Sequence, residues 1–128
     1  MSVQAQDSRI PIDTTIVTTN EVSVNGQKIT YKATTGMQPV WDDHGEVIAS
    51  LYFTYYQRTN VKNREKRPII MSFNGGPGSA SVWMHIAYTG PKVLNIDEEG
   101  YPIQPYGVKD NPNSIIDVAD IVYINPVN

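Results

Sequence analysis

The segment with the clearest chemical potential is a glycine-rich loop, Asn74-Gly75-Gly76-Pro77-Gly78-Ser79. Three glycines within four positions permit tight turns and let a ligand come close to the main chain. An apolar run precedes the loop at 69–73, and residues 79–88 are predicted to form a helix after it. The first N–H groups of such a helix point toward the loop and favour an anion or a developing oxyanion there.

Two familiar glycine-rich patterns do not fit this loop. A dinucleotide-binding fingerprint needs a third glycine, and the stretch from Gly76 ends in Ser81 instead. A P-loop needs Gly-Lys-Ser/Thr, and no lysine occurs between Lys66 and Lys92. An oxyanion-hole loop fits best, because glycine-rich segments supply one oxyanion donor after the third strand of α/β-hydrolases. A tight glycine turn without a ligand is the alternative.

The first half of the chain has a β pattern from residue 14 to 57. Val22 and Val24 alternate with polar residues, and Asn25-Gly26 predicts a hairpin turn with positive φ at both central positions. Residues 36–45 are predicted to be a loop, followed by a strand from 47 to 56. The charge cluster at 58–67 is predicted to be a solvated hairpin loop. Together these segments indicate an antiparallel meander.

After Pro68 the pattern changes to that of an α/β protein. The runs at 69–73 and 119–124 are nearly continuous in apolar residues, as is typical of strands buried on both faces. A glycine turn, the helix that Gly90-Pro91 should end, and a long connection lie between them. We expect an α/β fold: the opening part of an α/β-hydrolase sheet behind the meander, in an incomplete domain. Residues 1–13 are expected to be a disordered segment, and 14–128 the N-terminal portion of that domain.

Three motifs in sequence order resemble the serine carboxypeptidase family, peptidases of the α/β-hydrolase fold. The loop is similar to the family's N-G-G-P-G-x-S segment, and Gly90-Pro91 is similar to its Gly-Pro stop after the helix. Residues 110–127 resemble its N-P-x-S-W…F-I-D-x-P-V-G segment. The resemblance runs from about 69 to 127.

This resemblance implies roles for three loop residues. Gly76 corresponds to the glycine whose backbone N–H is one oxyanion donor. Asn74, with Gly75 beside it, corresponds to the residues that bind the C-terminal carboxylate of the substrate. Ser72 replaces a tryptophan that many members have, and Asn128 stands where the family has glycine. The implied reaction is removal of C-terminal residues from peptides and proteins, with no cofactor and no metal.

The catalytic triad is missing from these 128 residues, since no serine has glycine at both the −2 and +2 positions. In the family the nucleophile lies in G-E-S-Y-A-G, downstream of this segment. The chain alone is therefore predicted to be inactive, as a fragment or a truncated product. His85 is expected to be a packed helix residue rather than a base, and His44 to lie in an exposed turn. Asp97-Glu98-Glu99-Gly100 is expected to be a solvated turn.

Two other functions stay open. A proline iminopeptidase-like hydrolase carries H-G-G-P-G in this loop, and Asn74 in place of histidine speaks against it. A catalytically inactive, β-rich binding module is the non-enzymatic alternative. We also expect the isolated chain to associate with itself or a partner, because two apolar strands would lack neighbours.

Composition excludes several classes of partner. With 10 Lys and Arg against 13 Asp and Glu, the formal charge is 10 − 13 = −3, so a nucleic-acid partner is not expected. No apolar run approaches the ~20 residues that a membrane helix requires, and no cysteine is present. Val3-Gln4-Ala5 resembles the end of a signal-peptide cleavage site, which would indicate a secreted or periplasmic protein; a plain terminus fits equally well.

Overall fold

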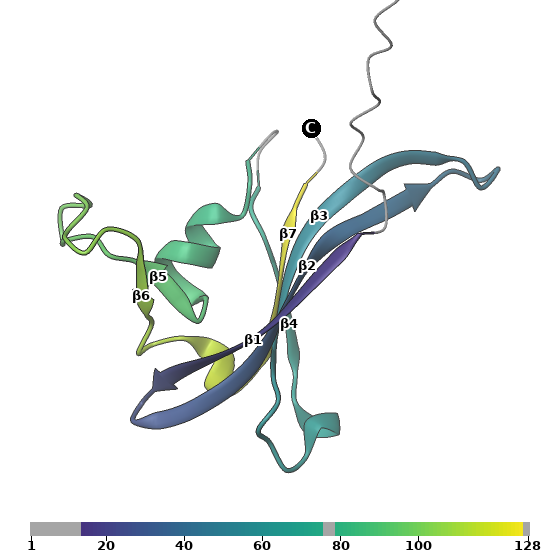
Figure 1. Ribbon diagram of the computed structural model, residues 1–128. Helices are drawn as coiled ribbons and strands as arrows, with labels where there is room; N and C mark the ends of the chain where they lie inside the picture. Colours follow the sequence, from purple (N-terminus) through teal and green to yellow (C-terminus); the bar gives the residue numbers. More distant parts are fainter. Residues whose placement is uncertain (1–13, 76–78, 127–128) are drawn as a thin grey trace, which may run out of the picture.

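The computed structural model describes residues 14–75 and 79–126. The expected disordered segment 1–13, the Val3–Ala5 motif, Gly76 and Asn128 lie outside the described residues. Five strands form one mixed sheet in the order β1-β2-β3-β7-β4 (Figure 1). Their bounds are Thr15–Val24 for β1, Gln27–Trp41 for β2, Val47–Arg58 for β3, Ile69–Phe73 for β4 and Asp120–Asn125 for β7.

The predicted meander is present, and its first turn is the one expected. Strands β1, β2 and β3 pair antiparallel in sequence order. Asn25 and Gly26 have φ values of 51° and 74°, as a two-residue hairpin turn requires.

The predicted loop at 36–45 is wrong over most of its length, because β2 continues to Trp41. Pro39 is tolerated because β1 pairs with β2 only as far as Gly36, so among residues 14–75 and 79–126 no strand pairs with that side of β2 beyond it. The turn itself is confined to 42–46. There the carboxylate Oδ1 of Asp42 accepts the N–H groups of His44 and Glu46, both at 2.9 Å.

The other two strands of the sheet form a parallel pair. Strand β4 pairs parallel with β7, and β7 pairs antiparallel with β3 on its other side. Because β7 lies between β3 and β4, the segment 58–67 is not a hairpin between adjacent strands. It holds the short 3-10 helix η1 (Arg64–Lys66).

The connection from β4 to β7 lies on one side of the sheet (Figure 1). It contains the π-helix η2 (Met84–Thr89), entered through one turn at 81–83, the ribbon of β5 (Lys92–Leu94) and β6 (Val108–Asp110), and the 3-10 helix η3 (Ile115–Asp117). The predicted helix at 79–88 therefore starts later than expected. It ends at Gly90 as predicted, where a Cβ would lie 2.2 Å from the carbonyl oxygen of His85.

The core lies between the β1–β2 hairpin and η3. It is a cluster of buried side chains: Val22, Val24, Ile29, Tyr31 and Ile116. In β7, Ile121 and Tyr123 are buried on the same face of the sheet.

The opposite face of the sheet is open over β4, which contradicts the expectation of a strand buried on both faces. Ile69, Met71 and Phe73 are 58%, 66% and 69% exposed. The physical reason is position: β4 is an edge strand, and within 14–75 and 79–126 no helix covers this face.

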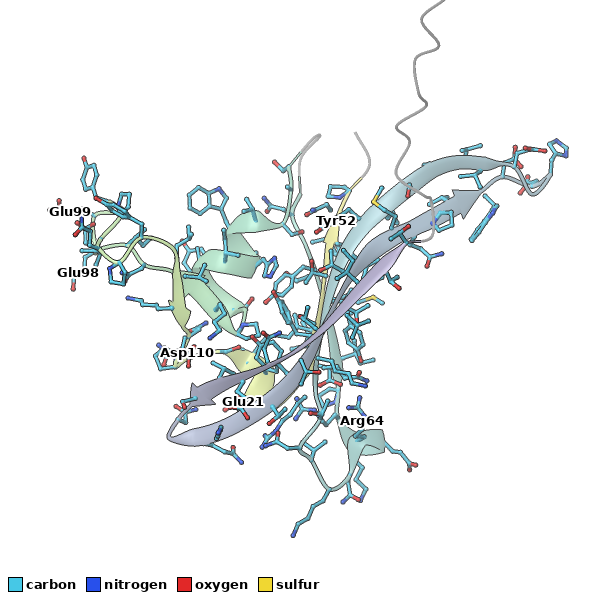
Figure 2. The ribbon with its side chains drawn as sticks, viewed as in Figure 1. Glu21, Tyr52, Arg64, Glu98, Glu99 and Asp110 are labelled. Atoms are coloured by element: carbon cyan, nitrogen blue, oxygen red, sulfur yellow. The ribbon has the colours of Figure 1, made fainter. Side chains whose placement is uncertain are left out.

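The basic cluster is a second correction, because two of its three arginines are not solvated: Arg58 is buried, and the Arg67 side chain is 9% exposed. The backbone N–H of Arg58 and the Nε of Arg67 each donate to Oδ1 of the buried Asp120 at 3.0 Å. Arg64, labelled in Figure 2, is exposed at the start of η1 and reaches Oδ2 of Asp120 at 3.4 Å. Lys62 and Lys66 remain exposed, as predicted for the whole segment.

Candidate functional site

The candidate site lies at the carboxyl ends of β4 and β7. Because these strands are parallel, both of these ends meet at one edge of the sheet, with Phe73 opposite Ile124. Asn74 follows β4 directly, and Asn125 is the last residue of β7. Ligands of open α/β sheets bind outside the carboxyl ends of the strands. Two amide side chains therefore lie at the edge where a ligand is expected.

Asn74 and Gly75 begin the glycine-rich loop. The Asn74 side chain is half-buried, and its Nδ2 donates to the carbonyl oxygen of Ala80 at 3.4 Å. An amide nitrogen has two N–H groups, and this bond uses only one of them. Gly75 is exposed, and a Cβ there would meet no atom within 4 Å, which leaves the main chain accessible. Gly76, the predicted oxyanion donor, lies outside the described residues.

Two residues after the loop, the chain is bound to β7 through Ser81, which the sequence did not mark as a functional residue. Ser81 is 1% exposed. Its backbone N–H donates to Oδ1 of Asn125 at 2.9 Å, and its Oγ donates to the carbonyl oxygen of Ile124 at 2.5 Å. The sequence does hold one indication that Asn125 is functional: it ends the apolar strand β7, just as Asn74 directly follows the apolar strand β4. Tyr52, which pairs with Asn125 across β3 and β7, lies at the same end of the sheet (Figure 2).

His85 belongs to an aromatic cluster beneath the helix, which confirms the expectation of a packed residue. Its ring stacks on Tyr123 with centroids 4.4 Å apart, and its Nε2 lies 2.5 Å from the hydroxyl oxygen of Tyr56. Burial lowers the pKa of His85 and raises the pKa of Tyr56; it also raises the pKa of Tyr123 to about 12. The cluster is therefore uncharged near neutral pH, and it anchors the helix on β3 and β7.

The Asn-Pro-x-Ser motif fixes the other end of the helix. Asn111 is 4% exposed, and its Nδ2 donates at 2.8 Å to the carbonyl oxygens of both Tyr88 and Gly90. Ser114 donates to the carbonyl oxygen of Thr89 at 2.9 Å. These bonds satisfy carbonyls that a helix end leaves without partners. The motif therefore stabilises the carboxyl end of the helix and lies away from the glycine-rich loop.

The remaining polar candidates form turns. His44 lies in the exposed turn at 42–46. The carboxylate of Asp97 accepts the N–H groups of Glu99 and Tyr101 at 3.0 and 2.8 Å, so the acidic segment is a turn as predicted. Glu98 and Glu99 lie at its tip, far from the sheet (Figure 2). Over the described ranges, no three metal-ligating side chains are grouped, and no helix is long and apolar enough to cross a membrane.

A family model for serine carboxypeptidases matches residues 24–128. The chain belongs to the serine carboxypeptidase family. No curated protein matches the sequence. Among solved structures, the chain is similar to the crystal structure of Kex1(delta)p, a prohormone-processing carboxypeptidase from Saccharomyces cerevisiae, with a TM-score of 0.54 and 23% sequence identity. That match covers 75% of this chain and 19% of the yeast chain.

The structural likeness supports the fold: a mixed, mostly β sheet with few helices, of the kind found in a serine carboxypeptidase. The chain spans about a fifth of the length of the yeast carboxypeptidase.

Proposed function

We propose that this chain contributes the oxyanion-hole and carboxylate-recognition loop of a serine carboxypeptidase, and that the Ser/Asp/His triad lies on polypeptide beyond these residues. The observation that carries the proposal is the position of Asn74 and Gly75, at the carboxyl edge of the β4–β7 pair, in a chain of this family. The accessible main chain at Gly75 and the half-buried Asn74 amide suit a small anionic group.

The proposed reaction is acyl transfer through a serine ester. The Asn74 amide binds the free C-terminal carboxylate of a peptide and thereby places the last peptide bond at the nucleophile. The serine oxygen attacks the carbonyl carbon of that bond, and the backbone N–H of Gly76 stabilises the negative charge that develops on the carbonyl oxygen. The C–N bond then breaks, and the C-terminal residue leaves as an amine that takes up the serine's proton through the histidine. Water hydrolyses the remaining serine ester and releases the shortened peptide with a new carboxylate. The substrates are therefore peptide and protein C-termini.

The sequence of the reading frame after Asn128 is the first test. The proposal expects G-T-G-Y/F-S shortly after it, then the nucleophile segment G-E-S-Y-A-G. A frame encoding neither segment would contradict the proposal and favour a non-catalytic binding module.

Active-site labelling is the second test. The 128-residue chain should not react with a fluorophosphonate above a heat-denatured control, because none of its eight serines lies in a nucleophile elbow. The longer protein should be labelled at a single serine beyond residue 128. Labelling of the short chain at any of its own serines would place the nucleophile elsewhere.

A further inference from the structure

We infer that Ser81 and Asn125 are positioning residues that hold the glycine-rich loop against β7, and so set where its donors lie. This inference rests on the proposed function. Its physical basis is that the residues flanking the loop are attached to the same short stretch of β7. Phe73, just before the loop, pairs with Ile124, and Ser81, two residues after it, bonds to Ile124 and Asn125.

The bond from Asn125 acts as a helix cap supplied by a neighbouring strand. The N–H of Ser81 lies at the entrance of the helix, and Ser81 also accepts the first helical bond, from the N–H of His85 at 3.0 Å. A helix's first N–H groups have no partner within the helix, and a nearby side chain usually accepts from them. Here the acceptor comes from β7, so the helix entrance is fixed to the sheet.

Burial makes the loss of the hydrogen bonds between Ser81 and β7 costly. Ser81 is 1% exposed, so water does not replace a lost partner easily. Its Oγ and its N–H bind two consecutive residues of β7, which restrains the serine in both translation and rotation. A fixed loop end matters because oxyanion donors act by being correctly placed before charge develops.

Two substitutions at Asn125 distinguish the effect of its hydrogen bond to Ser81 from the effect of its side-chain volume. Asn125→Asp keeps an oxygen at the same place to accept the Ser81 N–H, whereas Asn125→Leu has similar size and no acceptor. Ser81→Ala removes only the Oγ bond and serves as a second probe if the leucine variant does not fold.

The first readout uses the 128-residue chain and needs no activity. With Asn125→Leu we expect the amides of Ser81 and His85 to exchange with deuterium about tenfold faster than in the wild type. With Asn125→Asp the exchange rates of the same two amides should change less than about threefold. The amides of Val22 and Ile29 in the hairpin should be unchanged in both, which excludes global unfolding. Equal exchange in the wild type and in the leucine and alanine variants would overturn the anchor.

The second readout uses the longer, active protein. Asn125→Leu should lower kcat by roughly tenfold on free and amidated substrates alike and leave KM within about twofold; Asn125→Asp should restore kcat. A change confined to KM, or a normal kcat, would overturn the positioning role. A longer protein with no activity would contradict the proposed function instead, while the exchange result still decides whether the anchor exists.

Discussion

Single side chains divide the carboxyl edge of the β4–β7 pair into two tasks. Asn74 follows β4 at the start of the loop and, in the proposed function, binds the substrate carboxylate, whereas Oδ1 of Asn125 accepts the N–H of the buried Ser81. In that proposal the same residue type binds a ligand in one case and supports the fold in the other. Burial of the partner separates the two: Ala80 is exposed and Ser81 is not.

Asn74→Ala, made in the longer protein, should weaken binding of peptides with a free C-terminal carboxylate. Losing one hydrogen bond to a charged group costs about 1.5–3 kcal/mol, or roughly ten- to a hundredfold in kcat/KM. Substrates with an amidated C-terminus should change little, because they lack the charge that the amide binds. Steady-state kinetics on matched free and amidated dipeptides measures the difference.

Gly76→Pro is the contrasting variant, since proline removes the backbone N–H. It should lower kcat on both substrates by about a hundred- to a thousandfold if that N–H is an oxyanion donor. Equal losses on free and amidated substrates with Asn74→Ala would refute the carboxylate assignment.

Buried charge gives a stability prediction at the same scale. The side chains of Arg67 and Asp120 are 9% and 4% exposed, and Arg67 also donates to the carbonyl oxygen of Ile116 at 2.7 Å. Arg67→Met should reduce the free energy of unfolding by about 1.5–3 kcal/mol, the cost of losing a hydrogen bond to a charged group. The loss is limited because Asp120 keeps the backbone N–H of Arg58 and the more exposed Arg64. Urea unfolding followed by circular dichroism measures this.

Lys66→Met is the matched control, since Lys66 is exposed and should contribute less than about 0.5 kcal/mol. If the two variants lose similar stability, the contacts of Arg67 do not stabilise the fold.

Among the elements, the helix depends on an uncharged His85. The imidazole faces Tyr56 from β3 and Tyr123 from β7, and Tyr31 from β2 packs on Tyr56. In the part of the chain that the structure describes, no carboxylate hydrogen-bonds to the ring. Burial lowers the pKa of His85 in the folded state below its ordinary value of 6.5. The unfolded state then binds more protons below pH 6.5, so protonation favours unfolding.

The free energy of unfolding should therefore fall as pH decreases below 6.5 and level off above it. His85→Phe keeps a ring against Tyr123 and removes the titration, so its stability should be nearly constant from pH 5 to 7.5, apart from the carboxylates. His44→Gln, in the exposed turn, should retain the wild-type slope. Urea unfolding at closely spaced pH values provides the test; an unchanged slope in His85→Phe would disprove it.

Local patterns predicted the elements best where local chemistry decides them. Asn25-Gly26 defines a turn by itself, and Gly90 ends the helix because no Cβ fits there. The failures came from contacts, made or missing, that lie far apart in the sequence. Strand β2 continues through Pro39 because β3 pairs with it, and Arg67 is withdrawn from solvent because it binds Asp120, 53 residues away in the sequence. Strand β4 is exposed because it lies at the sheet edge.

The candidate site divides in the same way. Asn74 and Gly75 could be selected from the motif alone, because their chemistry follows from residue type. The role of Ser81 could not, since it depends on the parallel register that brings β7 beside the loop.

Viewed as a whole, the molecule has one covered and one open sheet face. The connection between β4 and β7 covers the first (Figure 1). On the second, a shallow groove of about 280 Å³ runs over four strands and is lined by Gln38, Leu51, Phe53, Met71, Val122 and Ile124. Parallel strands are normally covered on both faces, and large exposed apolar patches mark interaction surfaces. Strand β4 adds an open edge without a charged residue or proline within 69–73 to discourage pairing.

We expect the 128-residue chain to associate with a second copy of itself through this face, because both surfaces are apolar and uncharged at their centre. Met71 is 66% exposed in the middle of β4, so Met71→Lys should shift the population toward monomer without reducing the sheet signal in circular dichroism. Val118→Lys is the control, since Val118 is 63% exposed and does not line the groove. Sedimentation velocity from low to high micromolar concentration measures the effect. A wild-type chain that stays monodisperse and monomeric, with a cooperative melt, would show that the open face is stable in water by itself.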